Sequence, residues 1–116
     1  MDKLERYRAL ITRLLSECAT LLNNQHASRK SDVLAQCVFD AEREQYLLLK
    51  IGWAGKRRIR GITLYVRLQN GKFWIEEDMT EEGIATDLLE AGVPKEDIVL
   101  AFQPPDVRRF TEFATT

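Results

Sequence analysis

The sequence predicts an α+β fold in which one long N-terminal helix packs on an antiparallel meander of four strands, or of five. In the first 22 residues, apolar side chains recur every three or four positions, as in an amphipathic helix. From residue 33 to residue 75, short segments rich in β-branched and aromatic residues alternate with polar breaks. With 116 residues, of which 45% are hydrophobic, the chain can form one core, and we expect a single domain over residues 1–116.

The N-terminal helix is expected over residues 2–22, with a charged face turned to solvent. Its apolar face consists of Leu4, Tyr7, Ile11, Leu14, Leu15, Cys18, Leu21 and Leu22. The segment 23–31 that follows is polar, lacks periodicity and contains strong turn formers. We therefore expect a surface loop there.

Four strands are expected at 33–39, 45–51, 59–68 and 73–75. Asn70 and Gly71 favour positive φ and thus a tight hairpin, whereas residues 40–43 and 54–56 predict slightly longer connections. Alternation along the third strand predicts a dry face that the first helix covers and an opposite face that is more polar. The dry face comprises Ile62, Leu64, Val66 and Leu68, and the opposite face Thr63, Tyr65 and Arg67.

After the sheet, a second helix is expected around residues 84–89, with Asp78 or Thr80 as its cap and with Gly92 and Pro94 after its end. Residues 94–97 start a new turn, and residues 98–102 form either a helical turn or a fifth strand, because their periodicity fits both. The two prolines at 104–105 predict one more short turn. We expect Phe110 and Phe113 to hold the tail on the body.

Several kinds of catalytic and binding site lack their residues in this chain. His26 is the only histidine, so a His-Cys or His-His metal pair and a Ser-His-Asp triad cannot form within one chain, and a solvated side chain is expected. Cys18 and Cys37 lack CxxC spacing and are interpreted as buried thiols. No glycine-rich phosphate loop is present. The acids at 76–82 are typical of a solvated helix start, so we expect no catalytic, metal or cofactor site and no enzyme.

The balance of charge and apolar residues predicts a cytoplasmic protein without a membrane segment. Seventeen Lys and Arg against 18 Asp and Glu give a net charge of −1, so the whole chain exerts no polycationic field. The first residues are charged, and no apolar run approaches the roughly 18 residues of a spanning helix.

The most concentrated positive segment is Lys56–Arg60, in which Arg58 and Arg60 are expected on one side of a strand and Arg67 on the other. Its arginines can contact carboxylates of a protein partner, or phosphates of a nucleic acid with Trp53 stacked on a base. A charged strand edge that prevents aggregation is a third interpretation. Core or sheet packing is expected for the aromatics Trp53, Tyr65 and Trp74. The candidate surface comprises Trp53, Lys56, Arg57, Arg58, Arg60, Arg108 and Arg109.

Several blocks in their order resemble the XisI family, and they span most of the chain. They are Gly52-Trp53, the basic segment through Arg60, Lys72-Phe73-Trp74-Ile75, Thr80-Glu81, the run from Gly92 to Leu100, Phe102, Pro104-Pro105, Arg108 and Thr111-Glu112-Phe113-Ala114. Ala101 and Gln103 depart from the glycine and histidine expected in the Gly-Phe-His-Pro-Pro form of the tail motif. If that histidine has a chemical role, this chain lacks it.

The resemblance implies an accessory role in the programmed excision of the fdxN element during heterocyst differentiation in filamentous cyanobacteria. It also implies a nuclease-like partner of the XisH type, or a recombinase complex, that this non-enzymatic chain controls by contact. A DNA-binding factor that uses residues 56–60 is the alternative. A metal-dependent nuclease or hydrolase, with Asp40 and residues near Glu76 assembled only in an oligomer, is the second alternative. We expect a homo-oligomer, since an open sheet leaves edges and an aromatic face.

Overall fold

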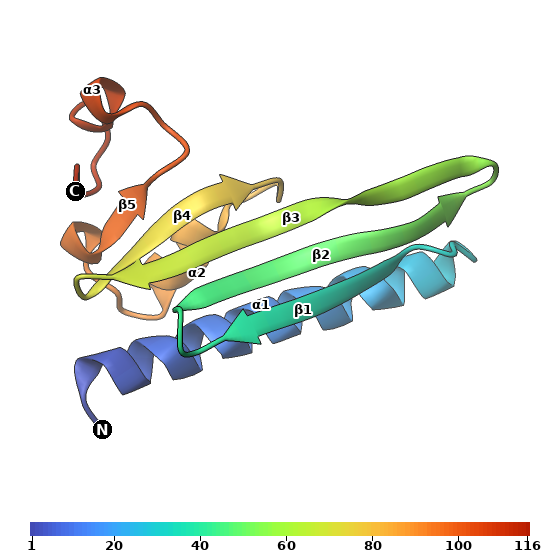
Figure 1. Ribbon diagram of the computed structural model, residues 1–116, viewed down its shortest axis with the longest axis horizontal. Coiled ribbons are helices and arrows are strands. Elements are labelled where there is room, and N and C mark those ends of the chain that lie inside the picture. The colour runs from blue at the N-terminus through green and yellow to red at the C-terminus, as the bar shows by residue number, and fades with distance from the viewer.

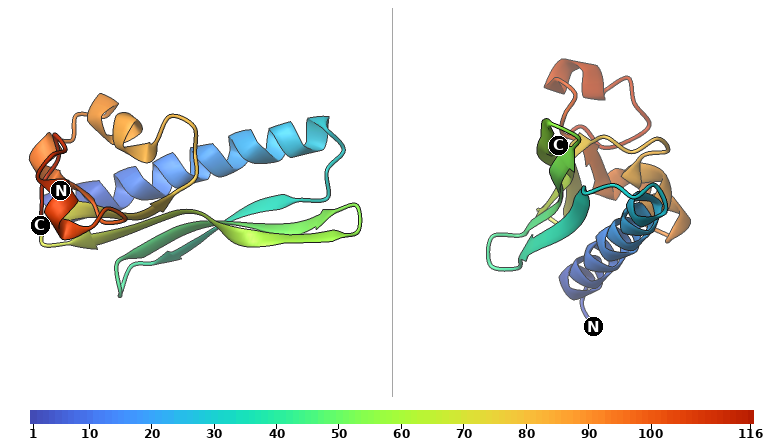
Figure 2. Two further views of the ribbon diagram at one scale, coloured as in Figure 1. Left: turned by 90° about the horizontal axis from the view of Figure 1, so that it is seen from above. Right: turned by 90° about the vertical axis from the view of Figure 1, so that its right-hand side faces the viewer.

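One five-stranded sheet carries both longer helices on the same face (Figure 1, Figure 2). The computed structural model describes residues 1–116. In chain order the elements are α1 (Lys3–Ser28), β1 (Leu34–Asp40), β2 (Gln45–Ala54), β3 (Arg57–Gln69), β4 (Lys72–Asp78), α2 (Ile84–Glu90), the 3₁₀ turn η1 (Lys95–Asp97), β5 (Ile98–Leu100) and α3 (Pro105–Arg108). The predicted α+β class, the helix-first order and the meander of β1 to β4 are confirmed.

The fifth strand makes the sheet mixed, so the prediction of a wholly antiparallel sheet is wrong. The pairs β1–β2, β2–β3 and β3–β4 are antiparallel, whereas β5 runs parallel to β4. The chain leaves β4, passes through α2 and η1, and returns to the end at which β4 began. A crossover of this kind is what a parallel neighbour requires.

Helix α1 ends at Ser28 instead of Leu22, because a tertiary contact extends it through the polar segment. The Asn23 side chain donates from Nδ2 to the carbonyl of Ala35 (2.9 Å) and accepts at Oδ1 from its N–H (2.8 Å). This amide occupies the outer edge of β1 and places the second half of α1 beside the sheet. Lys30, with φ of 53°, ends the helical path.

The hydrophobic core lies between the helices and the sheet, as the apolar pattern predicts, but Leu4 and Leu21 of the predicted apolar face are exposed. Helix α1 contributes Tyr7, Ile11 and Leu15 to it, and α2 contributes Ile84 and Leu88. The sheet contributes Ala35, Tyr46, Leu48, Leu64, Val66, Leu68, Phe73, Ile75 and Ile98. None of the helices has the length and apolar character needed to cross a bilayer.

A β-bulge in β3 changes which side chains share a face. Leu48 pairs with Leu64, but Leu49 pairs with Ile62, so Thr63 is an extra residue. Because side chains alternate along a strand, one extra residue moves everything before it to the other face. Ile62 therefore lies opposite the helices and Thr63 lies toward them, against the predicted alternation.

The bulge also corrects the predicted separation of the arginines. Arg58 pairs with Trp53 and Arg60 with Ile51, and both pairs lie on the same face as Arg67. We call this the open face, because neither α1 nor α2 covers it (Figure 2).

The segments after the sheet follow the prediction except at the start of α2 and at the aromatic tail. The N-cap of α2 is Gly83 and not the predicted Asp78 or Thr80, although Asp78 Oδ2 does accept a hydrogen bond from the Ile84 N–H at 2.6 Å. Residues 98–100 form a strand, and a short helix follows the two prolines. Phe113 packs against the core as expected, but Phe110 is 76% exposed and does not hold the tail.

Candidate interaction surfaces

The hairpin of β2 and β3 extends past its neighbours as an arm, which we define as residues 52–61. The pairing of β1 with β2 ends at Leu34 and Ile51, and that of β4 with β3 ends at Asp78 and Leu64. Figure 1 shows the arm projecting from the right-hand end of the sheet. Its turn contains only residues 55–56, so the predicted longer connection at 54–56 is wrong.

Gly52 at the base of the arm allows the segment before β1 to pass close to the backbone of β2. A Cβ atom at this position would lie 2.2 Å from the carbonyl oxygen of Asp32 and 2.7 Å from the Cα of Val33. The segment that enters β1 therefore passes against the backbone of β2 at a distance only glycine allows. This contact fixes the base of the arm against the end of the loop that follows α1.

Four cations of the arm have no partner of opposite charge. Lys56, Arg57, Arg58 and Arg60 are all exposed, and none has a carboxylate oxygen within 4.0 Å. The pairing places Arg58 and Arg60 on the open face and Arg57 on the other side. The arm therefore presents positive charge on both sides.

The three aromatic residues singled out in the sequence, Trp53, Tyr65 and Trp74, lie outside the core. Trp53 is 49% exposed on the arm, and the Arg58 guanidinium lies over its ring at 5.3 Å. Tyr65 and Trp74 are half-buried on the open face. The prediction of core or sheet packing is therefore wrong for Trp53, which is available to a ligand, whereas Tyr65 and Trp74 pack on the sheet without entering the core.

The tail arginines lie at the other end of the molecule from the arm (Figure 1). Arg108 donates hydrogen bonds to the carbonyls of Gln103 (3.0 Å), Ala101 (3.0 Å) and Thr115 (3.3 Å). Its guanidinium also lies 5.8 Å from the centre of the Trp74 ring. Arg109 is exposed beside Phe110. The seven candidate residues thus form two separate surfaces, and Arg108 has a role within the chain.

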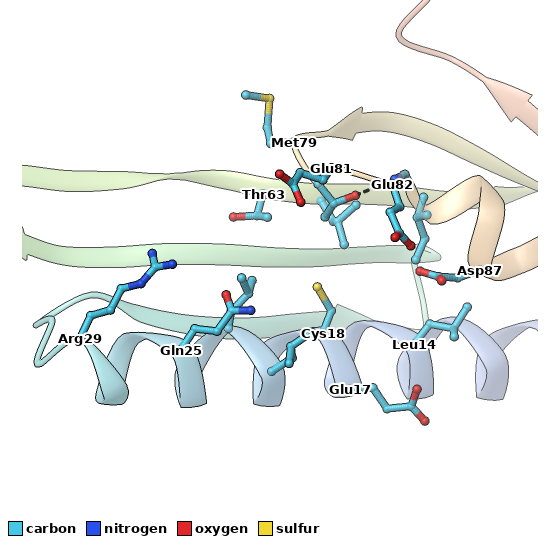
Figure 3. Close-up of a pocket in the computed structure, with 16 residues that line it drawn as sticks. Leu14, Glu17, Cys18, Gln25, Arg29, Thr63, Met79, Glu81, Glu82 and Asp87 are labelled. Carbon is cyan, nitrogen blue, oxygen red and sulfur yellow. Dashed lines mark hydrogen bonds between the residues drawn. The ribbon is translucent and has the colours of Figure 1, made fainter.

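An acidic groove of about 740 Å³ lies between α1, α2 and the loop after β4 (Figure 3). Its carboxylates are Glu17, Glu81, Glu82 and Asp87, and Arg29 is its one basic residue. Burial raises the pKa of Asp87, and the negative charges of neighbours such as Glu90 and Glu82 raise it further. Sequence reasoning missed this groove because its residues come from elements that are distant in the chain.

The residues singled out for nuclease chemistry have neighbours within the chain. Asp40 accepts a hydrogen bond from Arg43 at 2.8 Å, and Glu76 accepts one from Arg67 at 2.8 Å. No group of three or more His, Cys, Asp or Glu side chains is placed to hold a metal ion. His26, predicted to be solvated, is half-buried, and its buried Nδ1 has no hydrogen-bond partner.

The thiols are free and half-buried. Both Cys18 and Cys37 are unbridged, and burial raises the pKa of each thiol. Cys18 lines the groove, and the Cys37 thiol lies 3.5 Å from the carbonyl oxygen of Leu15. A raised pKa keeps a thiol protonated and weakly nucleophilic.

Comparison with known proteins identifies one family and solved structures of similar sequence and fold. The family described as "XisI protein" matches residues 1–115. The fdxN element excision controlling factor XisI from Anabaena variabilis is 42% identical, with a TM-score of 0.83, over 99% of this chain and 100% of that one. A XisI-like protein from the same organism is 31% identical, with a TM-score of 0.70, over 91% and 99% of the two chains. No curated protein matches the chain.

Proposed function

The chain belongs to the XisI family, and we propose that it is a non-enzymatic controlling factor that binds a nuclease-like protein of the XisH type. The process would be excision of a DNA element such as the fdxN element during heterocyst differentiation, in the cytoplasm. Support comes from the 42% identical chain, whose name is fdxN element excision controlling factor. The structural observation that carries the contact is the arm with four unpaired cations.

A protein partner fits these cations better than DNA does. A net charge of −1 gives the chain no long-range attraction for a polyanion, so a nucleic acid would meet only the arm. Arginine forms planar, two-pronged hydrogen bonds with carboxylates, and such pairs are strong when they are desolvated at the centre of an interface. The loss of one such pair costs about 2 kcal/mol or more, which is roughly a thirtyfold loss of affinity.

The test is co-purification of the tagged chain with the XisH-type protein of its host, with mass spectrometry of what is recovered. The variant Arg57→Glu/Arg58→Glu reverses charge on both sides of the arm and should abolish recovery of the partner. Arg6→Glu/Lys95→Glu is the matched control, since it changes the net charge equally at two exposed residues without ion pairs. Equal recovery with both variants would show that the arm is not the contact.

DNA binding is the second candidate, and the exposed Trp53 beside Arg58 is the observation that favours it. Stacked bases and neutralised phosphates would make affinity fall steeply as salt rises. Nuclease treatment before purification separates the two candidates. Recovery that resists nuclease supports the protein contact, whereas recovery that disappears with nuclease supports DNA.

A further inference from the structure

The open face of the sheet exposes a contiguous band of apolar side chains. Leu34 and Val38 of β1 are 49% and 46% exposed, and Ile51 and Trp53 of β2 are 38% and 49% exposed. Leu34 pairs directly with Ile51 and Val38 with Leu47, and the half-buried Leu47 and Leu49 connect the two pairs along β2. Figure 2 shows that α1 and α2 lie on the opposite side of the sheet. A connected apolar patch on a protein surface marks an interaction site, unlike a scattered exposed residue.

The edges of the two outer strands are partly occupied by contacts within the chain. A second protein is therefore more easily bound on the open face than at a sheet edge. The Asn23 amide occupies both backbone groups of Ala35 at the edge of β1. At the other edge, the Ala114 N–H donates to the carbonyl of Ile98 at 2.9 Å and the tail bridges to Val99. A strand added at either edge would have to displace these contacts.

Charge is distributed on the open face so that two copies complement each other. Arg60 lies beside Ile51 at the arm end of the band, and Glu77 lies beside Tyr65 at the other end. Neither Arg60 nor Glu77 has an ion-pair partner within the chain. When two such faces meet with their strands in opposite directions, each Arg60 lies at the end that carries Glu77 of the other copy.

We propose that the open face binds a second copy of this chain, giving a two-fold symmetric dimer in which two sheets pack face to face with opposed strands. The strand spacing sets the available area: β1 to β4 differ in length but average about nine residues, so together they cover an area of roughly 19 Å by 30 Å in projection. The accessible surface of the side chains is larger than this flat projection, and it approaches the roughly 800 Å² that each partner buries in an interface of standard size. Two-fold contacts of one patch with itself are the commonest form of assembly.

The test is the solution mass of the full chain, measured by analytical ultracentrifugation over a range of concentrations. Wild-type protein should sediment at twice the chain mass of 13.4 kDa. Val38→Lys/Ile51→Lys should sediment at the single-chain mass. Leu21→Lys/Met79→Lys is the control, because it alters two residues of similar exposure, 59% and 66%, away from the open face, and should remain dimeric. Circular dichroism verifies that each variant is folded.

A charge exchange tests the opposed strand direction. Arg60→Glu and Glu77→Arg should each raise the dissociation constant of the dimer about tenfold or more, because like charges then meet. The double variant should restore dimerisation. Wild-type protein that is monomeric at every concentration, or a Val38→Lys/Ile51→Lys variant that still dimerises, would overturn the proposal; a double variant without recovery would overturn the arrangement. All these measurements use the purified chain without a nuclease-like protein, so their outcome is independent of the test of the proposed function.

Discussion

At the scale of single residues, Arg108 holds the C-terminal tail by a combination of contacts that lysine does not reproduce. Its guanidinium donates to three backbone carbonyls, at Ala101, Gln103 and Thr115, and lies over the Trp74 ring. The planar guanidinium of arginine has several N–H donors that can bind carbonyls of different segments at once. The ammonium group of lysine is a compact point charge and cannot reach all of them. Arg109 next to it is exposed and has only Phe110 as a close aromatic neighbour.

We expect Arg108→Lys to lower the free energy of unfolding by about 1–3 kcal/mol, because at least two hydrogen bonds from a charged donor are lost. Urea titration followed by tryptophan fluorescence measures the change and also reports on Trp74. Arg109→Lys is the matched control and should leave the midpoint unchanged. Equal midpoints for the two variants would show that Arg108 does not hold the tail.

At the scale of elements, the position of the arm depends on Gly52. The contact of this residue with the segment before β1 leaves no room for a side chain, and its φ of 152° is one that other residues rarely adopt. Gly61 in the same hairpin provides the contrast. A Cβ atom there would meet only the end of the Lys50 side chain, at 3.7 Å.

Gly52→Ala should therefore destabilise the protein by about 2 kcal/mol or more, since backbone has to move away from the new methyl group. Gly61→Ala should cost little, because its methyl group finds an ordinary contact. Thermal unfolding of both variants gives the comparison, and amide hydrogen exchange should show the largest loss of protection near Val33 and Gly52. A Gly52→Ala variant as stable as Gly61→Ala would contradict the close crossing.

At the scale of the whole molecule, one polar contact joins the first helix to the turn before the last strand. The Tyr7 hydroxyl donates to Oδ2 of Asp97 at 2.5 Å, and Lys3 Nζ lies 2.9 Å from the same oxygen. Burial acts to raise the pKa of Asp97, but the hydrogen bonds from Tyr7 and Lys3 outweigh it and hold that pKa below its ordinary value of 3.8. Burial raises the pKa of Tyr7, and the bond to Asp97 raises it further.

These two shifts predict a stability plateau with a loss at each end. Because the pKa of Asp97 is lower in the folded state, its contribution is present above pH 3.8 and is lost as the pH falls through the folded value. Because the pKa of Tyr7 is higher in the folded state, its contribution is lost as the pH rises above 10, where the unfolded chain ionises.

Urea unfolding across pH measures both limbs. Tyr7→Phe should be less stable by about 1–2 kcal/mol near neutral pH, and it should lack the part of the alkaline loss that Tyr7 causes. Tyr65→Phe on the open face serves as the control, since it leaves the Tyr7–Asp97 contact intact. A wild-type alkaline limb retained in Tyr7→Phe would show that Tyr7 is not the group responsible.

Much of the secondary structure follows from the sequence because its signals are local. The apolar spacing of residues 4–22, the turn at residues 70–71 and the prolines at 104–105 each act on neighbours within a few positions. The structure contains the corresponding elements. The basic segment 56–60 is likewise evident from the sequence, because its cations are adjacent in the chain. The blocks that resemble XisI proteins, in their order, indicated the family.

The tertiary structure alone decided where those elements meet. It placed β5 parallel to β4, extended α1 through Asn23, inserted Thr63 as a bulge and brought Arg58, Arg60 and Arg67 to one face. It also assembled the acidic groove, and it placed the Arg108 guanidinium where it donates hydrogen bonds to backbone carbonyls of the tail. Each of these features depends on contacts between residues far apart in the sequence. Such contacts contribute to stability only when the whole chain has folded, so the local periodicity of the sequence does not predict them.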